Sequence, residues 1–421
     1  MARKYFGTDG VRGVVGESLT PELVEKLGRA SALWSEGGRV FVGRDTRGSG
    51  PELEEAFGRG VASAGGNAVL AGVLPTPAVA LLSLDLGAVI SASHNPPQYN
   101  GVKFFDGEGQ KLTDRSEEEI EALLDSPPAE LLGSIDRVGV ATDSYLEHIV
   151  ERFGTDLSGL RIAVDCANGA YSGIAPQAFE RLGAEVAAVA AAPDGQNINV
   201  GCGATDLSLL QGVVKAGGYD LGIAFDGDGD RMLAVDGEGE AIDGDQILAV
   251  VALDLGVELV AVTVMTNLGF HRLMAERGIE VVVTDVGDRY VLEALRERQG
   301  LLGGEQSGHL IYLKDHVTGD GLAAALLLCG ALEGRTLGEA VAVMPRFPQV
   351  HENVPVATKE LPPSLFEEVA RINAELGERG RILVRPSGTE PVVRVLAEAE
   401  DFREVQELCA TIAGLVRREL G

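Results

Sequence analysis

The chain is poor in several features that would mark a specialised class of protein. Its 421 residues include four widely spaced cysteines, Cys166, Cys202, Cys329 and Cys409, and no C-x-x-C pair. A disulfide framework or thiolate metal site is therefore not expected, and a reducing, cytoplasmic location is the simplest. Only 5% of residues are aromatic although 45% are hydrophobic, so the cores must be built from Val, Leu, Ile and Ala.

Positive charge and long apolar runs are also scarce. The 35 Lys and Arg residues face 64 Asp and Glu residues, and the net charge of −29 argues against nucleic acid or an anionic membrane as the main partner. The longest apolar region, residues 247–265, is interrupted by Asp254 and Glu258. It predicts a buried helix followed by a strand, not a membrane span. The N-terminal residues lack the apolar stretch of a signal peptide.

Glycine, in contrast, is abundant, with 56 residues, and strand-like and helix-like segments alternate. Thr20 and Pro21 are typical of a helix start. Expected helices and strands then follow at residues 40–42, 51–64, 68–70, 76–86 and 86–90. This alternation is typical of α/β units in which helices connect parallel strands, and the length allows two to four domains.

Prolines indicate where later units begin. An acidic helix is expected at 116–124, before Ser-Pro-Pro at 126–128, and Pro345 and Pro348 mark a last boundary. The remaining expected elements, all strands except the last, are residues 160–164, 221–225, 259–265, 280–284, 382–384, 392–397 and 402–420.

Three aspartates, Asp226, Asp228 and Asp230, alternate with glycine after a strand-like run. Carboxylates at this density repel one another unless a hard cation lies among them. An EF-hand loop is excluded, because Arg231 occupies the sixth position, where glycine is needed, and Gly237 the twelfth, where glutamate is needed. Three protein oxygens leave a Mg²⁺ site open to a phosphate oxygen and water. The alternative is a plain Asp-Gly turn between strands.

A serine follows the expected strand at 86–90. The segment S-A-S-H-N-P at 91–96 offers Ser93 as a hydroxyl nucleophile and His94 as its helper. Ser, Asn and Pro also form ordinary turns, and no G-x-S-x-G surrounds Ser93. Lys103 could stay charged beside a phosphate or carry a proton. A hydroxyl, a Mg²⁺ site and an arginine together suggest phosphoryl transfer.

The segment R-P-S-G-T-E-P at 385–391 carries groups that suit a phosphate dianion. Arg385 supplies a guanidinium fork, Ser387 and Thr389 supply hydroxyls, and Gly388 exposes backbone N–H groups. Arg394 follows a few residues later. The alternative is a hairpin turn with unrelated arginines.

Two further segments are weaker on their own. Glu305 and Ser307 are two residues apart, so in an extended loop both face one side and can hold sugar hydroxyls or an amine. Arg12, in the glycine-rich segment at 5–13, can meet a phosphate. That segment lacks the order of a dinucleotide-binding fingerprint.

These five segments, in their order along the chain, resemble the α-D-phosphohexomutase superfamily, and the resemblance runs from Tyr5 to about Leu420. The resemblance implies an α/β fold of four domains around a cleft, three similar mixed α/β units and a smaller C-terminal α+β domain. The expected domains are residues 1–140 with a phosphoserine loop, 141–238 with the Mg²⁺-binding Asp loop, 239–347 with the sugar-binding loop, and 348–421 with the phosphate-binding loop.

The resemblance also implies roles for individual residues. Ser93 would be the phosphoserine, and its phosphate would bind one Mg²⁺ per subunit together with Asp226, Asp228 and Asp230. The reaction site would be lined by Arg12, Lys103 and His309, with Arg231 beside the metal loop. The sugar and its non-reacting phosphate would be held by Glu305, Ser307, Arg385, Ser387, Gly388 and Thr389, helped by Arg394.

The implied activity is reversible isomerisation of a sugar phosphate, with a hexose 1,6-bisphosphate as intermediate or activator. Gln306 favours conversion of glucosamine 6-phosphate to glucosamine 1-phosphate, because neutral-sugar members usually carry Met there. Mannose and glucose phosphates stay the alternative. The expected partners are this sugar phosphate and a second copy of the chain in a homodimer, without nucleic acid or membrane.

Two other classes of protein are weaker alternatives. A non-catalytic sugar-phosphate-binding protein would tolerate loss of the nucleophile, yet Ser93 is present. A Mg²⁺ phosphatase would be expected to carry a D-x-D-x-T run, which the sequence lacks. Residues 97–99 depart from the commoner family residues, and the chain is slightly shorter than is usual, which leaves every motif in place.

Overall fold

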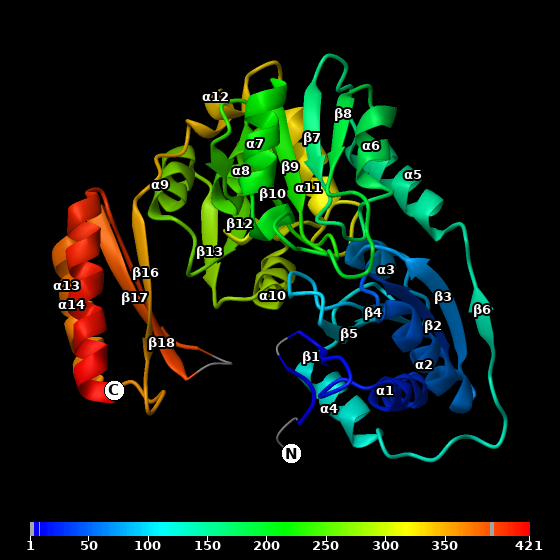
Figure 1. Ribbon diagram of the computed structural model, residues 1–421. Helices are drawn as coiled ribbons and strands as arrows, with labels where there is room; N and C mark the ends of the chain where they lie inside the picture. The colour runs from blue at the N-terminus through cyan, green and yellow to red at the C-terminus, as the bar shows by residue number, and fades with distance from the viewer. Residues whose placement is uncertain (1–3, 8, 388–390) are drawn as a thin grey trace. The chain divides into compact units, whose positions relative to one another are not determined.

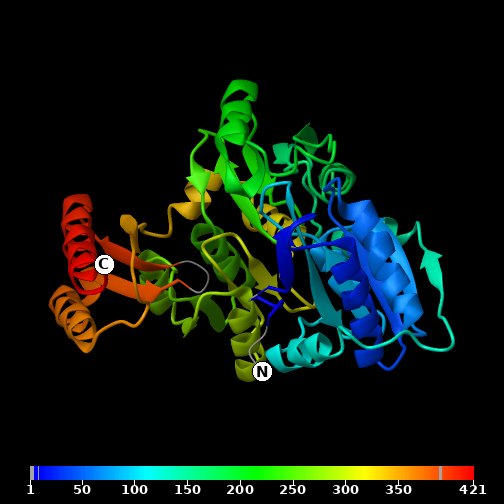
Figure 2. The same ribbon diagram turned by 60° about the horizontal axis from the view of Figure 1, so that its bottom comes forward.

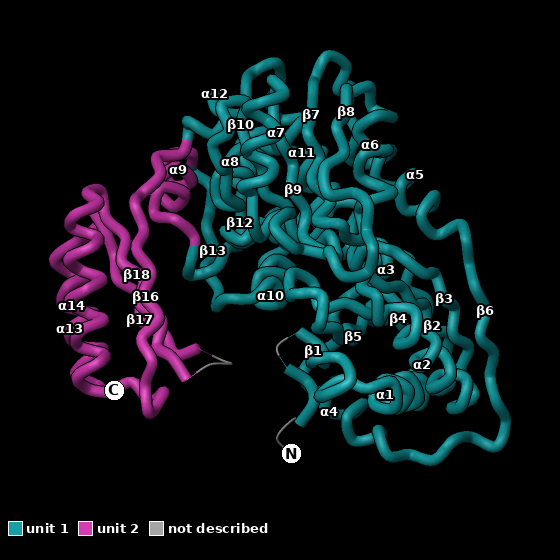
Figure 3. The backbone as a smooth tube through the Cα atoms, in the orientation of Figure 1, with its two compact units in different colours: residues 1–265, 278–343 teal, residues 266–277, 344–421 magenta. Residues whose placement is uncertain are grey.

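The computed structural model describes residues 4–7, 9–387 and 391–421. The chain forms two compact units (Figure 3). The first runs to Met265 and resumes at Gly278–Val343, and the second comprises Thr266–Arg277 and Met344–Gly421. Among the described helices, none is long and apolar enough to cross a membrane.

The first sheet carries the serine loop and has the strand order β1-β5-β4-β2-β3-β6 (Figure 1). Its strands are β1 (Val11–Val14), β2 (Arg39–Arg44), β3 (Asn67–Val73), β4 (Leu86–Ile90), β5 (Tyr99–Asp106) and β6 (Ile135–Arg137). Its helices are α1 (Pro21–Trp34), α2 (Gly50–Ser63), α3 (Thr76–Leu81) and α4 (Asp114–Ala122). Thr20 caps α1 by accepting a hydrogen bond from the Leu23 amide at 3.3 Å, as its position predicts.

Helices α1 and α2 lie side by side on this sheet, and Figure 2 shows the pair. Two glycines allow the close approach. A Cβ at Gly28 would lie 2.2 Å from the Phe57 carbonyl oxygen, and one at Gly60 would lie 2.0 Å from that of Glu25. Any side chain at either position would therefore force the two helices apart.

One expectation for this region is wrong. The helix expected at 76–86 ends at Leu81. The carboxylate of Asp85 accepts hydrogen bonds from the backbone and guanidinium of Arg39, and this ties the next residues to the start of β2. The expected strands, now β2, β3 and β4, do pair parallel, whereas β5, for which no strand was expected, pairs antiparallel with both β4 and β1. The eight residues between β4 and β5 are too few for a parallel crossover.

The second sheet carries the aspartate loop, in the order β11-β10-β9-β7-β8. Its strands are β7 (Arg161–Asp165), β8 (Glu185–Val189), β9 (Leu221–Phe225), β10 (Met232–Asp236) and β11 (Ala241–Ile242). Its helices are α5 (Ala141–Phe153), α6 (Ala175–Arg181), the short η1 (Gly203–Thr205) and α7 (Ser208–Gly217). Strands β7, β8 and β9 are parallel, whereas β9 and β10 form an antiparallel hairpin around the aspartates.

The third sheet has the order β13-β12-β14-β15 and carries the Glu305 loop. Its strands are β12 (Leu259–Thr263), β13 (Glu280–Thr284), β14 (Leu302–Gly304) and β15 (Leu310–Tyr312). Its helices are α8 (Gly244–Leu255), α10 (Asp288–Arg298), α11 (Gly321–Ala331) and α12 (Leu337–Val341). Helix α8 and strand β12 confirm that residues 247–265 are a buried helix followed by a strand.

In its described residues, the second unit contains the antiparallel sheet β16-β18-β17, three α-helices and one short 3₁₀-helix. Its strands are β16 (Gln349–Pro355), β17 (Gly380–Pro386) and β18 (Val392–Ala399). Its helices are α9 (Leu268–Arg277), α13 (Pro363–Leu376) and α14 (Phe402–Leu420), with the short η2 (Gly377–Arg379). Helix α9 belongs here because its first amide donates to Glu398 at 2.7 Å and Arg272 pairs with Glu400 at 3.0 Å.

The described chain thus confirms the expected class of mixed α/β units followed by an α+β part. The four domain boundaries stay a prediction, with residues 266–277 packing in the second unit. In each sheet of the first unit, one polar loop directly follows a buried strand: β4, β9 or β14. Ligands of α/β folds bind beyond the carboxyl ends of such strands.

Candidate active site

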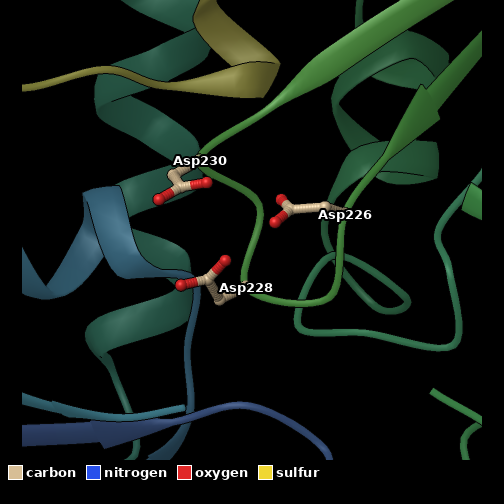
Figure 4. Close-up of side chains that lie close together, drawn as sticks. All are labelled: Asp226, Asp228 and Asp230. Atoms are coloured by element: carbon tan, nitrogen blue, oxygen red, sulfur yellow. The ribbon is translucent and has the colours of Figure 1, made fainter. Parts of the chain in front are cut away.

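The aspartate loop joins β9 to β10 and gathers three buried carboxylates. Asp226, Asp228 and Asp230 are at most 5% exposed. One carboxylate oxygen from each lies within 4.8 Å of the others, and Figure 4 shows the three side chains around a common space. The Asp-Gly turn and the carboxylate cluster are therefore both present. Gly229 has φ +80°, and a Cβ there would overlap the Tyr171 ring.

Helix starts that accompany the first and third sheets, Thr76 of α3 and Gly321 of α11, hold this loop in place. From the first, the Thr76 hydroxyl donates to Asp228 Oδ2 at 2.7 Å and its amide to the Asp228 carbonyl at 2.9 Å. From the third, the Gly321 amide donates to the Gly229 carbonyl at 3.0 Å. The carboxylates therefore stand on a rigid base.

The cluster fits a metal ion. Asp228 Oδ1 and Asp230 Oδ1 are buried and lack a hydrogen-bond partner in the described part of the chain. Burial and the neighbouring carboxylates of Asp228 and Asp230 raise the pKa of Asp226 well above its usual range. A hard cation would supply both the missing contacts and the missing positive charge. The three buried carboxylates could therefore hold a metal ion.

Ser93 lies in direct contact with the cluster. Its hydroxyl donates to Asp226 Oδ2 at 2.6 Å, and its Oγ lies 3.3 Å from His94 Nδ1. Burial, followed by the positive charges of Arg231 and Arg12, lowers the pKa of His94 to about 4. His94 is therefore neutral near pH 7 and adds no charge beside the serine.

Lys103, on β5, connects two of the aspartates to the N-terminal loop. Its ammonium lies 3.1 Å from Asp228 Oδ2, 3.1 Å from Asp9 Oδ2 and 3.5 Å from Asp230 Oδ2. Burial alone would lower the pKa of Lys103, but these carboxylates together raise it above its ordinary value. Lys103 therefore partly neutralises the cluster.

Three charged residues at this site escaped the sequence analysis: Asp9, Lys111 and Asp288. Lys111 bridges the other two, at 3.0 Å from Asp9 and 2.5 Å from Asp288. His309 Nε2 lies 3.4 Å from Asp288, and its Nδ1 lies 3.8 Å from Asp230. Asp9 could have been noticed, since it stands in the glycine-rich segment with Arg12 and pairs with it. Nothing in the sequence near Lys111 or Asp288 points to the site.

The third sheet contributes the Glu305 loop. Glu305 is 8% exposed and accepts a hydrogen bond from the Gly287 amide at 3.1 Å. The Ser307 hydroxyl donates to the second oxygen of Glu305 at 3.4 Å, so the two side chains do face one side. The loop is a turn and not an extended segment, and Gln306 lies between them half-buried. Arg231 Nε stands 3.9 Å from Asp230 Oδ1.

The second unit holds the arginine-serine segment. Arg385 and Arg394 are directly opposite each other on β17 and β18, so both guanidinium groups emerge on one face. Arg394 donates to the Ser387 hydroxyl at 3.4 Å, and Lys359 donates to the Ser387 carbonyl at 2.9 Å. This face concentrates positive charge around Ser387. Gly388 and Thr389 lie outside the described residues.

Comparison with family models matches nearly the whole chain. The four domains of the phosphoglucomutase/phosphomannomutase family match in order: alpha/beta/alpha domain I at residues 3–129, domain II at 143–239, domain III at 243–347 and the C-terminal domain at 348–415. The polar loops described above fall in these four segments in the same order. The four-domain α/β architecture is thereby established.

Individual relatives agree. The phosphoglucosamine mutase of Moorella thermoacetica is 47% identical over 98% of both chains, and that of Thermobifida fusca is 48% identical over 99% of both. A crystal structure of a phosphoglucomutase/phosphomannomutase family protein from Burkholderia thailandensis has a TM-score of 0.85 at 26% identity, covering 99% of this chain and 98% of its own. The chain therefore belongs to the phosphoglucomutase/phosphomannomutase family of α-D-phosphohexomutases, which are isomerases, and within it is similar over its full length to bacterial phosphoglucosamine mutases.

Proposed function

We propose that the protein interconverts glucosamine 6-phosphate and glucosamine 1-phosphate through a phosphoserine at Ser93. One observation carries the chemistry: the Ser93 hydroxyl lies 2.6 Å from Asp226 inside a buried carboxylate cluster. The full-length similarity to phosphoglucosamine mutases supports the sugar. The product would supply amino-sugar nucleotide and cell-wall precursor synthesis in the cytoplasm.

The proposed reaction has two mirrored half-reactions. In the first, the free O1 hydroxyl of glucosamine 6-phosphate attacks the phosphorus of phospho-Ser93. The bond from phosphorus to Ser93 Oγ breaks and the bond to O1 forms; O1 gives its proton to a neighbouring base, and Ser93 Oγ takes up a proton as it leaves. The 1,6-bisphosphate then turns around. In the second, Ser93 Oγ gives up its proton and attacks the phosphorus on O6; the bond from phosphorus to O6 breaks, and O6 takes up a proton.

Asp226, Asp228 and Asp230 would hold one Mg²⁺. This ion, when bound, would neutralise charge on the transferring phosphoryl group. Mg²⁺ suits a site with three carboxylates whose remaining positions stay open to phosphate oxygen or water. Arg231, beside Asp230, would add positive charge at the same group.

Lys103 is the preferred proton carrier, and His309 is the second candidate. Because the surrounding carboxylates raise the pKa of Lys103, its ammonium suits the step that returns a proton to the leaving oxygen. Both contact Asp230, and Lys103 also contacts Asp228, so either can stand beside a hydroxyl at the phosphoryl group. Arg12 would bind phosphate oxygens. Glu305 and Ser307 would hold the sugar through hydroxyl or amine hydrogens.

Arg385, Ser387, Gly388 and Thr389, helped by Arg394, would bind whichever phosphate is not reacting. The positive face around Ser387 supports this assignment. The same groups would serve both half-reactions, since the two phosphates of the intermediate exchange places. A homodimer is also part of the proposal, and light scattering of the purified protein tests it.

The sugar preference is tested by comparing three substrates. We expect kcat/KM for glucosamine 6-phosphate to exceed that for glucose or mannose 6-phosphate by about 10- to 100-fold. A charge-assisted hydrogen bond to the ammonium group of the sugar contributes about 1.5–3 kcal/mol. A difference of about 1.36 kcal/mol corresponds to a tenfold change in kcat/KM. Gln306→Met should narrow this ratio without changing the melting temperature, since Gln306 is only half-buried. A higher kcat/KM for a neutral sugar would reassign the enzyme to mannose or glucose phosphates.

Removal of the Arg385 guanidinium tests the shared phosphate site. Arg385→Ala should cost about 1.5–3 kcal/mol of transition-state binding, or roughly a 10- to 100-fold loss in kcat/KM. The loss should be equal in both directions at substrate concentrations below KM, because a catalyst cannot shift the overall equilibrium. Bisphosphate should also accumulate in solution, since the intermediate would dissociate before turning around. Coupled assays of turnover and of released bisphosphate measure both effects.

The matched control is Arg379→Ala, an exposed arginine of the same unit whose side chain is 59% exposed. It should leave turnover and bisphosphate release unchanged. Arg385→Ala should also leave Ser93 phosphorylated. A loss of turnover without released bisphosphate would assign Arg385 to stability or chemistry instead of retention of the intermediate.

A further inference from the structure

Arg47 makes a set of contacts that the reaction scheme above does not use. Its side chain is completely buried, directly beneath the serine loop. Its guanidinium donates to the carbonyl oxygens of Ser93 at 2.8 Å, Asn95 at 2.8 Å, Pro96 at 2.5 Å and Tyr99 at 2.9 Å. The fifth donor, Nε, bonds Asp45 at 2.8 Å. All five N–H groups of the side chain are thus satisfied, three of them by residues 91–98 and a fourth by Tyr99, the first residue of β5.

Asp45 extends this network to the other side of the Ser93 peptide. Its Oδ2 balances the charge of Arg47 and accepts a hydrogen bond from the Ser91 hydroxyl at 2.6 Å. Ser91 Oγ in turn accepts the Ser93 amide at 2.8 Å. The Ser93 backbone is therefore held at its N–H through Ser91 and at its carbonyl by Arg47.

A residue from the second sheet's segment holds the same carbonyl. Asn199 Nδ2 donates to the Ser93 carbonyl at 2.9 Å and to that of Asn95 at 3.3 Å. Asn199 comes from the segment between β8 and η1. The segment that carries the second sheet therefore supplies the aspartates and also a hydrogen bond to the loop that carries Ser93.

The conformation held in this way is one that a serine does not adopt freely. Ser93 has φ +51°, in the left-handed region that disfavours residues with a side chain. Such a backbone persists only where its surroundings over-determine it, and it recurs at functional sites. None of the contacts from Arg47, Ser91 or Asn199 uses Ser93 Oγ, which instead donates to Asp226.

We propose that Arg47, Ser91 and Asn199 are positioning residues that hold Ser93 in this strained conformation, from which its Oγ receives and releases the phosphoryl group. The inference rests on the proposed function. It assigns these residues to the rate of phosphoryl transfer, whereas a purely structural role would affect only stability. Substrate binding should be little changed, because none of the three contacts the Glu305 loop in the described chain.

Three variants of graded severity test this proposal. Arg47→Lys keeps the charge beside Asp45 but has three donors, so at least two contacts are lost. Ser91→Ala removes the hydroxyl that accepts the Ser93 amide, and Asn199→Ala removes the donor to the Ser93 and Asn95 carbonyls. Because Asn199 has φ +59°, alanine there also strains its own segment, so Ser91→Ala is the cleaner variant. We expect kcat to fall on the order of 100-fold for Arg47→Lys and about tenfold for the other two. KM should stay within about threefold.

The decisive measurement is the rate at which dephosphorylated enzyme acquires phosphate on Ser93 from glucose 1,6-bisphosphate, followed by intact-mass analysis. This rate should fall in parallel with kcat. Matched controls are Arg29→Lys and Ser31→Ala, a half-buried arginine bonded to Ser63 and a buried serine bonded to Gly28 in α1. The controls should lower the melting temperature by similar amounts without slowing phosphorylation.

If Arg47→Lys fails to fold, Ser91→Ala and Asn199→Ala decide the matter. If the wild type is active and the variants still acquire phosphate on Ser93 at the normal rate, the inference is wrong while the proposed function stands. A wild-type protein with no mutase turnover and no phosphate on Ser93 would overturn the proposed function, and the inference with it.

Discussion

Ser93→Ala is expected to abolish mutase turnover, by a factor on the order of 10³ or more, while the protein stays folded. Ser93 Oγ is the proposed carrier, and loss of a covalent nucleophile removes the whole reaction path. The loop itself is anchored through backbone groups of Ser93, which alanine retains. Turnover of glucosamine 6-phosphate and intact mass of both proteins give the result, with phosphate on wild type only.

The matched control for this variant is Ser31→Ala, which also removes a buried hydroxyl. It should keep full turnover. Comparable turnover in Ser93→Ala and wild type would exclude Ser93 as the phosphoryl carrier. Phosphate on the alanine variant would place the modification on another residue.

The second large effect is expected at the carboxylate cluster. Asp228→Asn should reduce turnover more than the roughly 10- to 100-fold loss seen when a residue that only orients a metal ligand is replaced. It should also raise the Mg²⁺ concentration required for half-maximal turnover. A chelator should stop the wild-type reaction, and Mg²⁺ should restore it. Calcium should not, because the loop lacks the bidentate glutamate of a calcium site.

Thermal unfolding separates this role from a structural one. Ligand that binds only the folded state raises its stability, so Mg²⁺ should raise the melting temperature of wild type more than that of Asp228→Asn. The control is Asp236→Asn, a buried aspartate at the far end of β10 that accepts the amides of Glu238 and Glu240. It should lower stability and keep the metal dependence. Collapse of Asp228→Asn, with an unchanged Mg²⁺ requirement in its residual activity, would make the site structural.

Local sequence patterns predicted the elements with strong signals of their own. Strand β9 and helix α14 lie at the expected residues, 221–225 and 402–420. The first is a short apolar run that ends at an Asp-Gly turn, and the second has helical periodicity with Asp401 as cap. Strand pairing was less accessible, because the direction of β5 depends on residues 91–98 folding back upon β4.

The residues of the candidate site could likewise be predicted from the sequence only where their local pattern is distinctive. Ser93, the three aspartates and the Glu305 loop stand out because each follows a buried strand and consists of residues with distinctive chemistry. Lys111 and Asp288 did not, since their importance comes from meeting each other across 177 positions of sequence. Arg47 was missed for a different reason. Most of its partners are backbone carbonyls, which every sequence contains, so nothing in the residue types points to the contacts.

The discontinuous second unit has a consequence for the order of events during synthesis. Helix α9, residues 268–277, leaves the ribosome well before β16, β17 and β18, the strands of the sheet in its unit. Residues 278–421 must still be made, which takes about 7–30 s at 5–20 residues per second. A helix of 10 residues is marginal in water alone, so α9 waits for its partners in a partly formed state. The same connectivity means that residues 344–421, expressed alone, would lack the contacts of Leu268 with Glu398 and of Arg272 with Glu400. The second unit is therefore complete only when residues 344–421 pack against residues 266–277, which are translated much earlier.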